Sequence, residues 1–266
     1  MKHISSIQNN LIKEVVALQS KAKTRKEKGL FIVEGQRELQ LALHGGFEAK
    51  TIFWCAEIFR TDEFEKWQSK FDEKTEYVRV SREVYQKIGM RENTEGVVGV
   101  ILQKNKDVTD WAPKNKNPLI IVLESIEKPG NLGAVLRTAD AVKVDAVLVT
   151  EQHTDLYNPN VIRSSVGGFF NVPIFICGNQ QALTFLTKYG IHMYAASLQK
   201  SVSYTLKDYS QPTAFIMGSE ANGLSTFWYQ KGVSSVKIPM LGQVDSLNVS
   251  VATAILAYEA IRQRKS

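Results

Sequence analysis

The sequence of 266 residues contains only two cysteines and no long apolar run. Cys55 and Cys177 stand alone without a CxxC spacing, which fits a reducing compartment and argues against structural zinc. We expect both to be buried as small hydrophobic side chains. No stretch approaches the roughly 18 uninterrupted apolar residues of a membrane span, and the N-terminus lacks the apolar core of a signal peptide. We therefore expect a cytoplasmic protein with no membrane partner and no metal.

Two nucleotide-binding fingerprints are also missing. Gly218 and Gly223 have the separation of the P-loop glycines, but Leu224 stands where the phosphate-binding lysine belongs. No GxGxxG run follows any expected strand. ATP-dependent chemistry and a nucleotide-dependent oxidoreductase are therefore poor candidates.

The composition is that of an ordinary globular protein, with 44% hydrophobic and 23% charged residues. The length exceeds the roughly 100–200 residues of a typical domain, so two domains are expected. The formal net charge of +6 gives a modest positive field, which suits an anionic partner such as a nucleic acid. Many enzymes without such a partner share this charge, so it does not decide the function.

Short apolar runs alternate with helical patterns in two series, which indicates an α/β fold. The first series, in residues 1–103, begins with a helix that Asn9 or Asn10 could cap and that runs into the charged stretch Lys21–Lys28. Residues 104–117 surround Trp111 with Lys, Asn and Pro and indicate a polar linker. The second series fills residues 118–266. Strands are expected at 31–33, 51–54, 77–80, 97–102, 119–123, 146–149, 173–176, 192–196, 214–217 and 236–238, with a final helix from about Leu247.

The first of three unusual loops follows the strand at 119–123. Ligands of parallel α/β sheets gather beyond the carboxyl ends of strands, so such loops are candidate sites. A Pro-Gly turn leads into a helix that Asn131 can cap and that carries Arg137 about 9 Å further along. A surface ion pair between Arg137 and Asp140 is the simpler explanation of that arginine.

The other two unusual loops precede the end of the chain. Gly218–Leu224 is bracketed by glycines and holds Glu220, although a tight turn also explains both glycines. The last loop brings Ser246 and Asn248 to the start of the final helix, where capping explains one of these two side chains. Because that helix is apolar on nearly every side, it should be buried against its own sheet or another subunit.

These three segments resemble, in order, the three sequence motifs of the SpoU (TrmH-like) methyltransferases. The matching stretches are Asn131–Arg137 with the following Thr-Ala-Asp, the Gly-Ser-Glu-Ala-Asn-Gly-Leu loop, and Ile-Pro-Met followed by Ser-Leu-Asn-Val-Ser-Val-Ala. Arg163–Gly168 is similar to a further family segment. The stretch Ile32–Arg37 and the α/β pattern around it resemble the family's L30e-like substrate-binding domain. Lys143 stands where family members often have glycine, so we expect a slightly different helix end without effect on chemistry.

The resemblance implies an RNA ribose 2′-O-methyltransferase that uses S-adenosylmethionine, with an RNA-binding L30e-like domain at 1–103 and a catalytic α/β domain at 118–266. It also implies a deep trefoil knot in the catalytic domain and a homodimer built partly on the C-terminal helix. The residues it assigns to catalysis are Asn131, Arg137, Glu220, Ser246 and Asn248. The residues it assigns to cofactor binding are Met217, Gly218, Glu220, Gly223, Leu224, Ile238, Met240, Ser246, Leu247 and Asn248.

For the family, the arginine that matches Arg137 is proposed to take the proton of the 2′-hydroxyl. Because a guanidinium stays charged far above neutral pH, we favour a clamp that polarises the hydroxyl and stabilises developing alkoxide. RNA contacts are expected from Lys21–Lys28, Arg37 and Arg163, since phosphate neutralisation drives affinity for RNA.

The sequence leaves alternatives for the substrate and for the reaction. An L30e-like domain is similar to ribosomal protein modules and favours 23S rRNA, with a tRNA 2′-O-methyltransferase as the alternative. A noncatalytic RNA-binding protein of this fold would have lost the polar motif residues, all of which are present. A knotted methyltransferase that modifies a base nitrogen is disfavoured by the Asn131–Arg137 motif.

Overall fold

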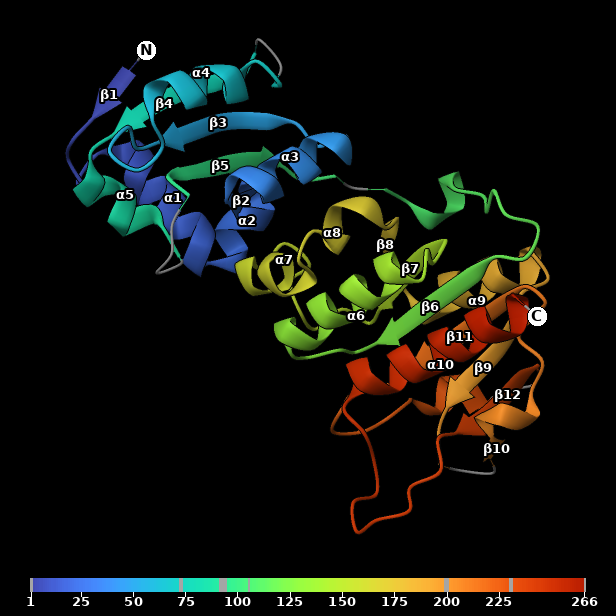
Figure 1. The fold of residues 1–266 in the computed structure, drawn as a ribbon. Coiled ribbons are helices and arrows are strands. Elements are labelled where there is room, and N and C mark those ends of the chain that lie inside the picture. Colours follow the sequence, from blue (N-terminus) through green and yellow to red (C-terminus); the bar gives the residue numbers. More distant parts are fainter. Residues whose placement is uncertain are drawn as a thin grey trace. The chain divides into compact units, whose positions relative to one another are not determined.

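The computed structural model describes residues 2–71, 74–90, 95–104, 106–198, 201–229 and 232–265. The chain forms two compact units (Figure 1). The N-terminal unit contains Met1–Lys104 and the later segment Tyr157–Ile162, and the C-terminal unit contains Asn105–Leu156 and Arg163–Ser266. Each unit has a hydrophobic core of its own.

The N-terminal unit contains a five-stranded mixed sheet in the order β1-β4-β3-β5-β2. β4 runs parallel to β1 and β3, whereas β5 is antiparallel to β2 and β3. The expected strands are confirmed, but β1 and α4 were not expected, because few of their residues are apolar. The elements are β1 (Lys2–Ile4), α1 (Asn10–Ser20), α2 (Ala22–Lys28), β2 (Leu30–Glu34), α3 (Gln36–His44), β3 (Ala49–Trp54), α4 (Thr61–Gln68), β4 (Glu76–Val80), α5 (Arg82–Ile88) and β5 (Val97–Leu102).

The first helix is not continuous with the charged stretch that follows it. Asn9 caps α1 with its side chain, and Lys21 then takes an extended conformation that separates α1 from α2. Arg25 is 2% exposed and donates to the carbonyl oxygens of Leu18 and Gln19, at 2.6 and 3.1 Å. Arg25 therefore caps the end of α1, which corrects its inclusion among the expected RNA contacts.

A segment from far along the chain completes the N-terminal unit. Tyr157 is buried, and its ring centroid lies 4.8 Å from that of Phe31. Its hydroxyl donates to the carbonyl oxygen of Lys104 at 2.6 Å and accepts from the backbone N–H of Lys104 at 2.8 Å. Hydrophobic periodicity reports only on neighbours along the chain, so the sequence did not indicate this return.

The C-terminal unit contains a seven-stranded parallel sheet in the order β10-β12-β9-β11-β6-β7-β8. Every strand expected in this half of the sequence is confirmed. The elements are η1 (Val108–Asp110), β6 (Leu119–Glu124), α6 (Pro129–Ala141), β7 (Ala146–Thr150), α8 (Gly168–Asn171), β8 (Ile174–Cys177), α9 (Asn179–Lys188), β9 (His192–Ala196), β10 (Val202–Ser203), η2 (Tyr204–Leu206), β11 (Thr213–Met217), η3 (Thr226–Tyr229), β12 (Val233–Lys237) and α10 (Val249–Arg264). The short helix α7 (Pro159–Ser165) belongs to the N-terminal unit up to Ile162 and to the C-terminal unit from Arg163.

Helices cover both faces of this sheet. Ile120 and Val122 of β6 face a cluster that includes Phe185 of α9 and Trp228 of η3. α6 and α10 pack against each other, side by side (Figure 1). α10 buries one side but leaves Val251 46% exposed, so the chain alone does not bury it all round.

The stretch expected to be a polar linker is partly built into the C-terminal core. Val108 is 1% exposed, and the ring of Trp111 lies 5.6 Å from that of Phe185 and 5.3 Å from that of Phe175. The apolar side chains in the middle of this polar stretch therefore anchor it, and Lys and Asn residues remain at its surface.

The end of α6 has the backbone conformation that glycine favours. Lys143 has a φ of 54°, in the left-handed region where a Cβ is disfavoured. The helix end at Lys143 therefore keeps a turn that glycine would form with less strain. Both cysteines, Cys55 and Cys177, are free and buried, as expected.

Candidate active site

Three loops of the C-terminal unit begin at the carboxyl ends of its strands. The loop after β6 leads into α6, the loop after β11 is formed by residues 218–225, and the loop after β12 leads through residues 238–248 into α10. β6 and β11 are paired neighbours in the sheet, so their loops start side by side. This edge is where parallel α/β sheets bind ligands.

Side chains from the three loops join in one hydrogen-bonded network. The Asn131 amide nitrogen donates to the Glu220 carboxylate. The Asn131 amide oxygen accepts from the Asn248 amide nitrogen at 3.1 Å. Asn248 caps α10, because its oxygen accepts from the Ser250 backbone N–H at 2.9 Å. Three of the five predicted catalytic residues, distant in the sequence, therefore lie in direct contact.

Asn131 does not cap its helix, which corrects that expectation. Pro129 occupies the first turn, and the helix begins after Lys128 as N-cap. Proline suits this position because its missing N–H would have no helical partner there. Asn131 thus lies inside the first turn, and its amide is available to Glu220 and Asn248.

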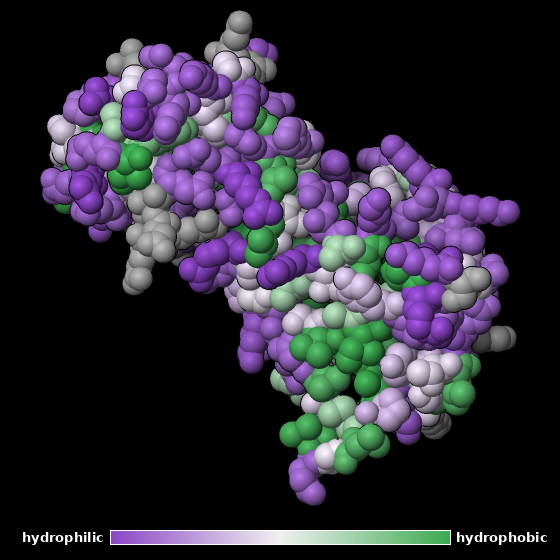
Figure 2. All heavy atoms as spheres, in the orientation of Figure 1, coloured by the Kyte–Doolittle hydropathy of each residue, from purple (hydrophilic) through white to green (hydrophobic). Residues whose placement is uncertain are grey.

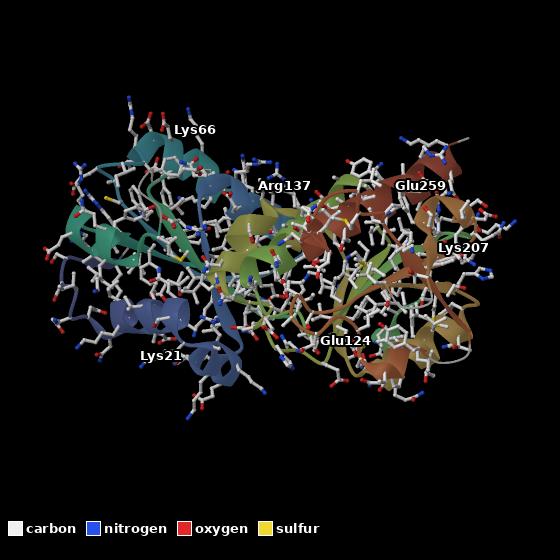
Figure 3. The ribbon with its side chains drawn as sticks, turned by 90° about the horizontal axis from the view of Figure 1, so that it is seen from below. Lys21, Lys66, Glu124, Arg137, Lys207 and Glu259 are labelled. Carbon is white, nitrogen blue, oxygen red and sulfur yellow. The ribbon has the colours of Figure 1, made fainter. Side chains whose placement is uncertain are left out.

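Arg137 lies further along α6 and is exposed (Figure 3). Within the described ranges it makes no hydrogen bond or ion pair, so the alternative of a pair with Asp140 has no support there. Its guanidinium has five N–H donors and is free to bind an anion from outside the chain.

Close packing by a glycine fixes the backbone at Arg137. A Cβ on Gly168 would lie 2.6 Å from the carbonyl oxygen of Leu136 and 3.1 Å from the Cα of Arg137. α8 can approach α6 this closely only because Gly168 has no side chain. Gly168, the last residue of the stretch Arg163–Gly168, thus packs against the middle of α6.

Ser246 stands apart from the network. It is exposed, and its hydroxyl contacts only the neighbouring carboxylate of Asp245, at 3.2 Å, among the residues that the structure describes. Residues 241–248 are all exposed, and Leu241 is 98% exposed. The structure therefore does not bring Ser246 to the other predicted catalytic residues.

The loop after β11 is closed by its own backbone. Ser219 and Gly223 exchange two hydrogen bonds, at 3.0 and 2.9 Å. A Cβ on Gly218 would lie 2.1 Å from the carbonyl carbon of Gly223, and Gly223 has a φ of 66°. Both glycines are therefore required for the turn, and they leave peptide groups open to a ligand.

The remaining predicted cofactor residues are apolar and differ in exposure. Met217 and Leu224 are buried at the two ends of the loop after β11. Ile238 and Met240 are partly buried, and Leu247 is exposed. A ligand with an aromatic ring can use such side chains together with nearby peptide groups.

A functional candidate that the sequence reasoning missed is Glu124, the last residue of β6 (Figure 3). It is 2% exposed, and its carboxylate accepts hydrogen bonds from Asn179 and Ser225. A charged residue that ends an otherwise apolar strand could have signalled it, because buried carboxylates are rare without dedicated donors.

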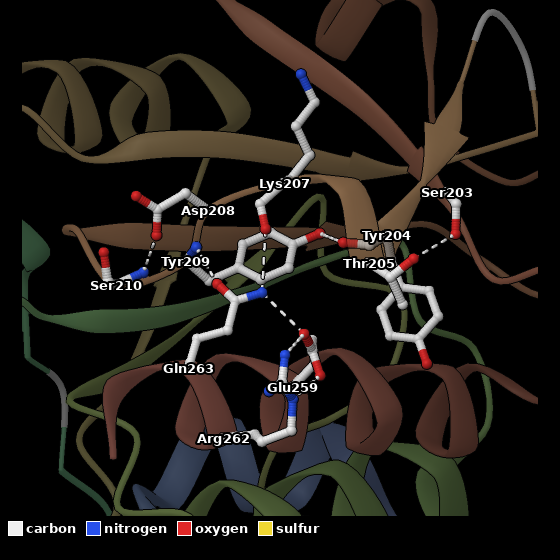
Figure 4. Close-up of polar contacts among 10 residues, drawn as sticks. All are labelled: Ser203, Tyr204, Thr205, Lys207, Asp208, Tyr209, Ser210, Glu259, Arg262 and Gln263. Atoms are coloured by element: carbon white, nitrogen blue, oxygen red, sulfur yellow. Dashed lines mark hydrogen bonds and ion pairs between the residues drawn. The ribbon is translucent and has the colours of Figure 1, made fainter. Parts of the chain in front are cut away.

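The far end of α10 is held at the opposite edge of the sheet. The Gln263 amide accepts from the backbone N–H of Tyr209 at 2.7 Å and donates to Glu259 at 2.8 Å (Figure 4). Hydrogen bonds from Arg262, helped by Gln263, lower the pKa of Glu259 to about 2. Arg264 donates to the carbonyl oxygens of Asn117, Pro118, Tyr209 and Gln211.

The basic stretch of the N-terminal unit is partly neutralised within the chain. Lys28 pairs with Glu14 at 3.3 Å, and Lys23 lies 3.8 Å from Glu27. Lys21, Lys26, Arg37 and Arg163 are exposed.

Neither a metal centre nor a membrane span is found in the described part of the chain. Among those residues, no three His, Cys, Asp or Glu side chains are grouped so that they could hold a metal ion. None of the described helices has both the length and the apolar character needed to cross a membrane.

Family comparisons cover both units. The model of the SpoU rRNA Methylase family matches residues 118–258. The model of the MRM3-like substrate binding domain matches residues 9–99.

Individual relatives match along nearly the whole chain. An uncharacterized tRNA/rRNA methyltransferase of Synechocystis is 32% identical, over 98% of this chain and 94% of that protein. A 23S rRNA (guanosine-2′-O)-methyltransferase of Bacillus subtilis is 28% identical, over 97% and 98%. The crystal structure of an AdoMet-bound rRNA methyltransferase from Sinorhizobium meliloti has a TM-score of 0.90 and 29% identity, with 98% of this chain and 97% of that chain covered.

Proposed function

The chain belongs to the SpoU rRNA methylase family, and on that premise we propose that it transfers a methyl group from S-adenosylmethionine to a ribose 2′-hydroxyl of 23S rRNA. The observation that carries the proposal is the network of Asn131, Glu220 and Asn248. These side chains come from three separate motifs and meet at the ligand-binding edge of the sheet. The chain is thus an S-adenosylmethionine-dependent RNA ribose 2′-O-methyltransferase.

The choice of 23S rRNA over tRNA rests on the N-terminal unit. The Bacillus subtilis relative, whose substrate is 23S rRNA, aligns over 98% of its length, so the alignment includes this unit. We propose that the N-terminal unit binds the RNA and that the exposed Lys21, Lys26 and Arg37 contact its phosphates. The C-terminal unit then carries the chemistry.

The loop after β11 fits S-adenosylmethionine. Because a Cβ on Gly218 would meet the backbone of Gly223, the turn needs glycine there, and its peptide N–H and C=O groups can donate to and accept from an adenine ring. Leu224 is buried at the end of this turn, and Ile238 and Met240 are partly buried apolar side chains of the loop after β12. We assign cofactor binding to these residues together with Met217, Glu220, Gly223, Ser246, Leu247 and Asn248. When bound, S-adenosylmethionine supplies the activated methyl group.

Arg137 is the residue that we assign to the RNA hydroxyl. Its guanidinium is exposed and is not engaged by the described residues, and its planar fork can hold a phosphate while donating to the neighbouring 2′-oxygen. A positive charge at that oxygen would stabilise the negative charge that develops as the hydroxyl gives its proton to solvent water and the oxygen bonds the methyl group. The guanidinium itself stays protonated, so it acts as a clamp and not as a base.

The network of Asn131, Glu220 and Asn248 holds the three loops of the site in position. Asn131 has its amide orientation set by two partners, since its nitrogen faces Glu220 and its oxygen faces Asn248. It ties the first turn of α6 to the loop after β11 and to the start of α10. Much of the catalysis of methyl transfer is correct positioning, so this cross-link has a direct role in the rate. We assign Ser246 to the cofactor side, where its exposed hydroxyl is available to a ligand.

We also propose a homodimer built on α10 and a knotted catalytic domain. Figure 2 shows hydrophobic side chains gathered on one face of the C-terminal unit. Val244, Leu247, Val251 and Tyr258 are 64%, 37%, 46% and 55% exposed. Such a patch commonly marks an interface. The trefoil knot is supported by the motif resemblance, because the last two motifs form it in the family.

Replacing Val251 by glutamate tests the dimer. The residue is exposed in the single chain, so Val251→Glu should fold normally but give monomers in light scattering. Ile176→Glu, at a 43% exposed site on β8, is the matched control and should stay dimeric. A dimeric Val251→Glu protein would contradict the proposed interface.

The function itself is tested by mapping 2′-O-methyl groups in a strain without this gene. Mass spectrometry of its rRNA and tRNA should show one missing 2′-O-methyl in 23S rRNA. The wild-type gene should restore it, and the purified protein should methylate the same rRNA fragment only with S-adenosylmethionine. A missing modification in tRNA instead would reject the rRNA substrate, and loss of a base methyl group would reject ribose methylation.

A further inference from the structure

A buried carboxylate lies at the end of the inner strand β6. Glu124 is 2% exposed, and among the described residues it forms no ion pair. Its carboxylate instead accepts three hydrogen bonds. Asn179 donates from its side-chain nitrogen at 2.6 Å, and Ser225 donates from its backbone N–H at 2.7 Å and from its hydroxyl at 2.6 Å.

The three donors are well matched to a charged acceptor. Removing a carboxylate from water is costly unless every lone pair finds a donor. Hydrogen bonds to an ionised acceptor are shorter and about twice as strong as neutral ones. The three distances, 2.6 to 2.7 Å, are in that short range. Glu124 therefore holds its hydrogen-bond donors firmly in place at the carboxyl end of β6.

Two of these bonds go to the residue at which the loop after β11 ends. At its start, this loop continues a buried strand through Met217. Within the loop, the Ser219–Gly223 bonds make the turn rigid. At its end, Ser225 is exposed at the surface, and Glu124 holds both its backbone and its side chain. Glu124 thus sets where the rigid turn lies relative to the sheet.

The position of this turn matters for both proposed functions of the loop. It carries Gly218, Gly223 and Leu224, which we assign to the cofactor. It also carries Glu220, which contacts Asn131 of α6. A shift of the end of the turn would move the residues that we assign to the cofactor, and the sheet itself would stay intact.

We propose that Glu124 is a positioning residue for S-adenosylmethionine binding, acting through Ser225 on the loop formed by residues 218–225. This inference rests on the proposed function of that loop. Asn179 is the second support, because it fixes the carboxylate from the start of α9.

Calorimetry with S-adenosylmethionine tests the proposal in the full-length protein. In Glu124→Gln the amide presents an N–H₂ group to one of the three donors and loses the charge. We expect the Kd for S-adenosylmethionine to rise about tenfold or more, as for the loss of a charge-assisted hydrogen bond. Glu127→Gln, the same change at an exposed site in the following loop, should leave that Kd unchanged.

Ser225→Ala gives a second, milder measurement that leaves the core untouched. It removes the hydroxyl bond but keeps the backbone bond, so a rise in Kd of about threefold is expected. Combined with Glu124→Gln, it should add little, because both changes break the same link. Amide hydrogen exchange in residues 218–225 should become faster in both variants, and slow exchange elsewhere in the sheet should persist.

The outcomes separate this inference from the proposed function. If the wild-type protein does not bind S-adenosylmethionine, the proposed function fails and the inference fails with it. If the wild type binds but Glu124→Gln and Ser225→Ala both keep its affinity within about twofold, the inference alone is wrong. A lower melting temperature of Glu124→Gln with unchanged cofactor affinity would likewise overturn it, because Glu124 would then only stabilise the fold.

Discussion

In the C-terminal sheet, polar side chains at the carboxyl ends of the strands (the carboxyl edge) and at their amino ends (the amino edge) have opposite roles. The helix α10 reaches both. At the carboxyl edge, Asn248 begins α10 and joins an exposed network with Asn131 of α6. Arg137, further along α6, is exposed and has no partner in the described chain. At the amino edge, Arg264 ends α10 and is saturated by four backbone carbonyl oxygens. The two arginines have the same chemistry and different surroundings.

This contrast separates what holds the fold from what is left for a ligand. A guanidinium that already donates to the backbone at 2.9 Å has little capacity left for RNA, so Arg264 stabilises the unit. A guanidinium that donates to no described residue contributes little to folding and can bind a substrate. Substitutions at the two edges should therefore affect different measurements.

Arg137→Lys should give the largest effect. Lysine keeps the charge but lacks the planar fork, so we expect turnover to fall by roughly a hundredfold or more, equivalent to about 2.7–4 kcal/mol of transition-state stabilisation. Cofactor affinity and melting temperature should stay unchanged. Methylation assays on 23S rRNA fragments, beside calorimetry and thermal melts, measure all three. Arg60→Lys, at an exposed surface pair, is the control. Near wild-type turnover would remove Arg137 from the mechanism.

Arg264→Lys should show the converse behaviour. One ammonium cannot reach the carbonyl oxygens of Asn117, Pro118, Tyr209 and Gln211 together. Leaving partly buried carbonyls unpaired should lower the free energy of unfolding by about 1–3 kcal/mol. Chemical denaturation measures this loss, and turnover well below the melting temperature should be retained. If Arg264→Lys lost activity but kept its stability, the proposed difference between Arg264 and Arg137 would be wrong.

Asn131→Asp should give an intermediate effect at the carboxyl edge. It places a second carboxylate against Glu220 and removes the amide donor, so the two like charges repel. We expect turnover at neutral pH to fall about tenfold, the effect of roughly 1.4 kcal/mol. Because one proton shared by the two carboxylates restores a hydrogen bond, activity relative to wild type should recover on acidification. A pH-independent ratio of the two rates would contradict this network.

Glu259→Gln should have the smallest effect, at the amino edge. Arg262 and Gln263 lower the pKa of Glu259 from 4.5 to about 2, so the folded protein favours the ionised form. The resulting stability is present above pH 4.5 and is lost as the pH falls toward 2. Because Arg262 is exposed, the contribution should be no more than about 1 kcal/mol. Melting temperatures of variant and wild type should therefore converge below pH 4.5. A difference that does not change with pH would contradict the assignment.

The strands could be predicted from the sequence because alternating apolar runs report on local structure. The candidate site was reached differently, through motif resemblance, because no local pattern shows that Asn131 and Asn248, 117 residues apart, touch. The positions of Glu124 and Arg264 were not predicted for the same reason: their partners lie up to 101 and 147 residues away. The prediction that Asn131 caps α6 is wrong because Pro129 starts the helix earlier.

The return of Tyr157–Ile162 to the N-terminal unit has a consequence for synthesis of the chain. Although Met1–Lys104 leaves the ribosome first, the unit is not complete until Ile162 has followed. At roughly 5–20 residues per second, that wait lasts on the order of several seconds. During this interval Phe31 lacks the ring of Tyr157. A chain that stalls there would present this aromatic surface to other nascent chains or to a chaperone.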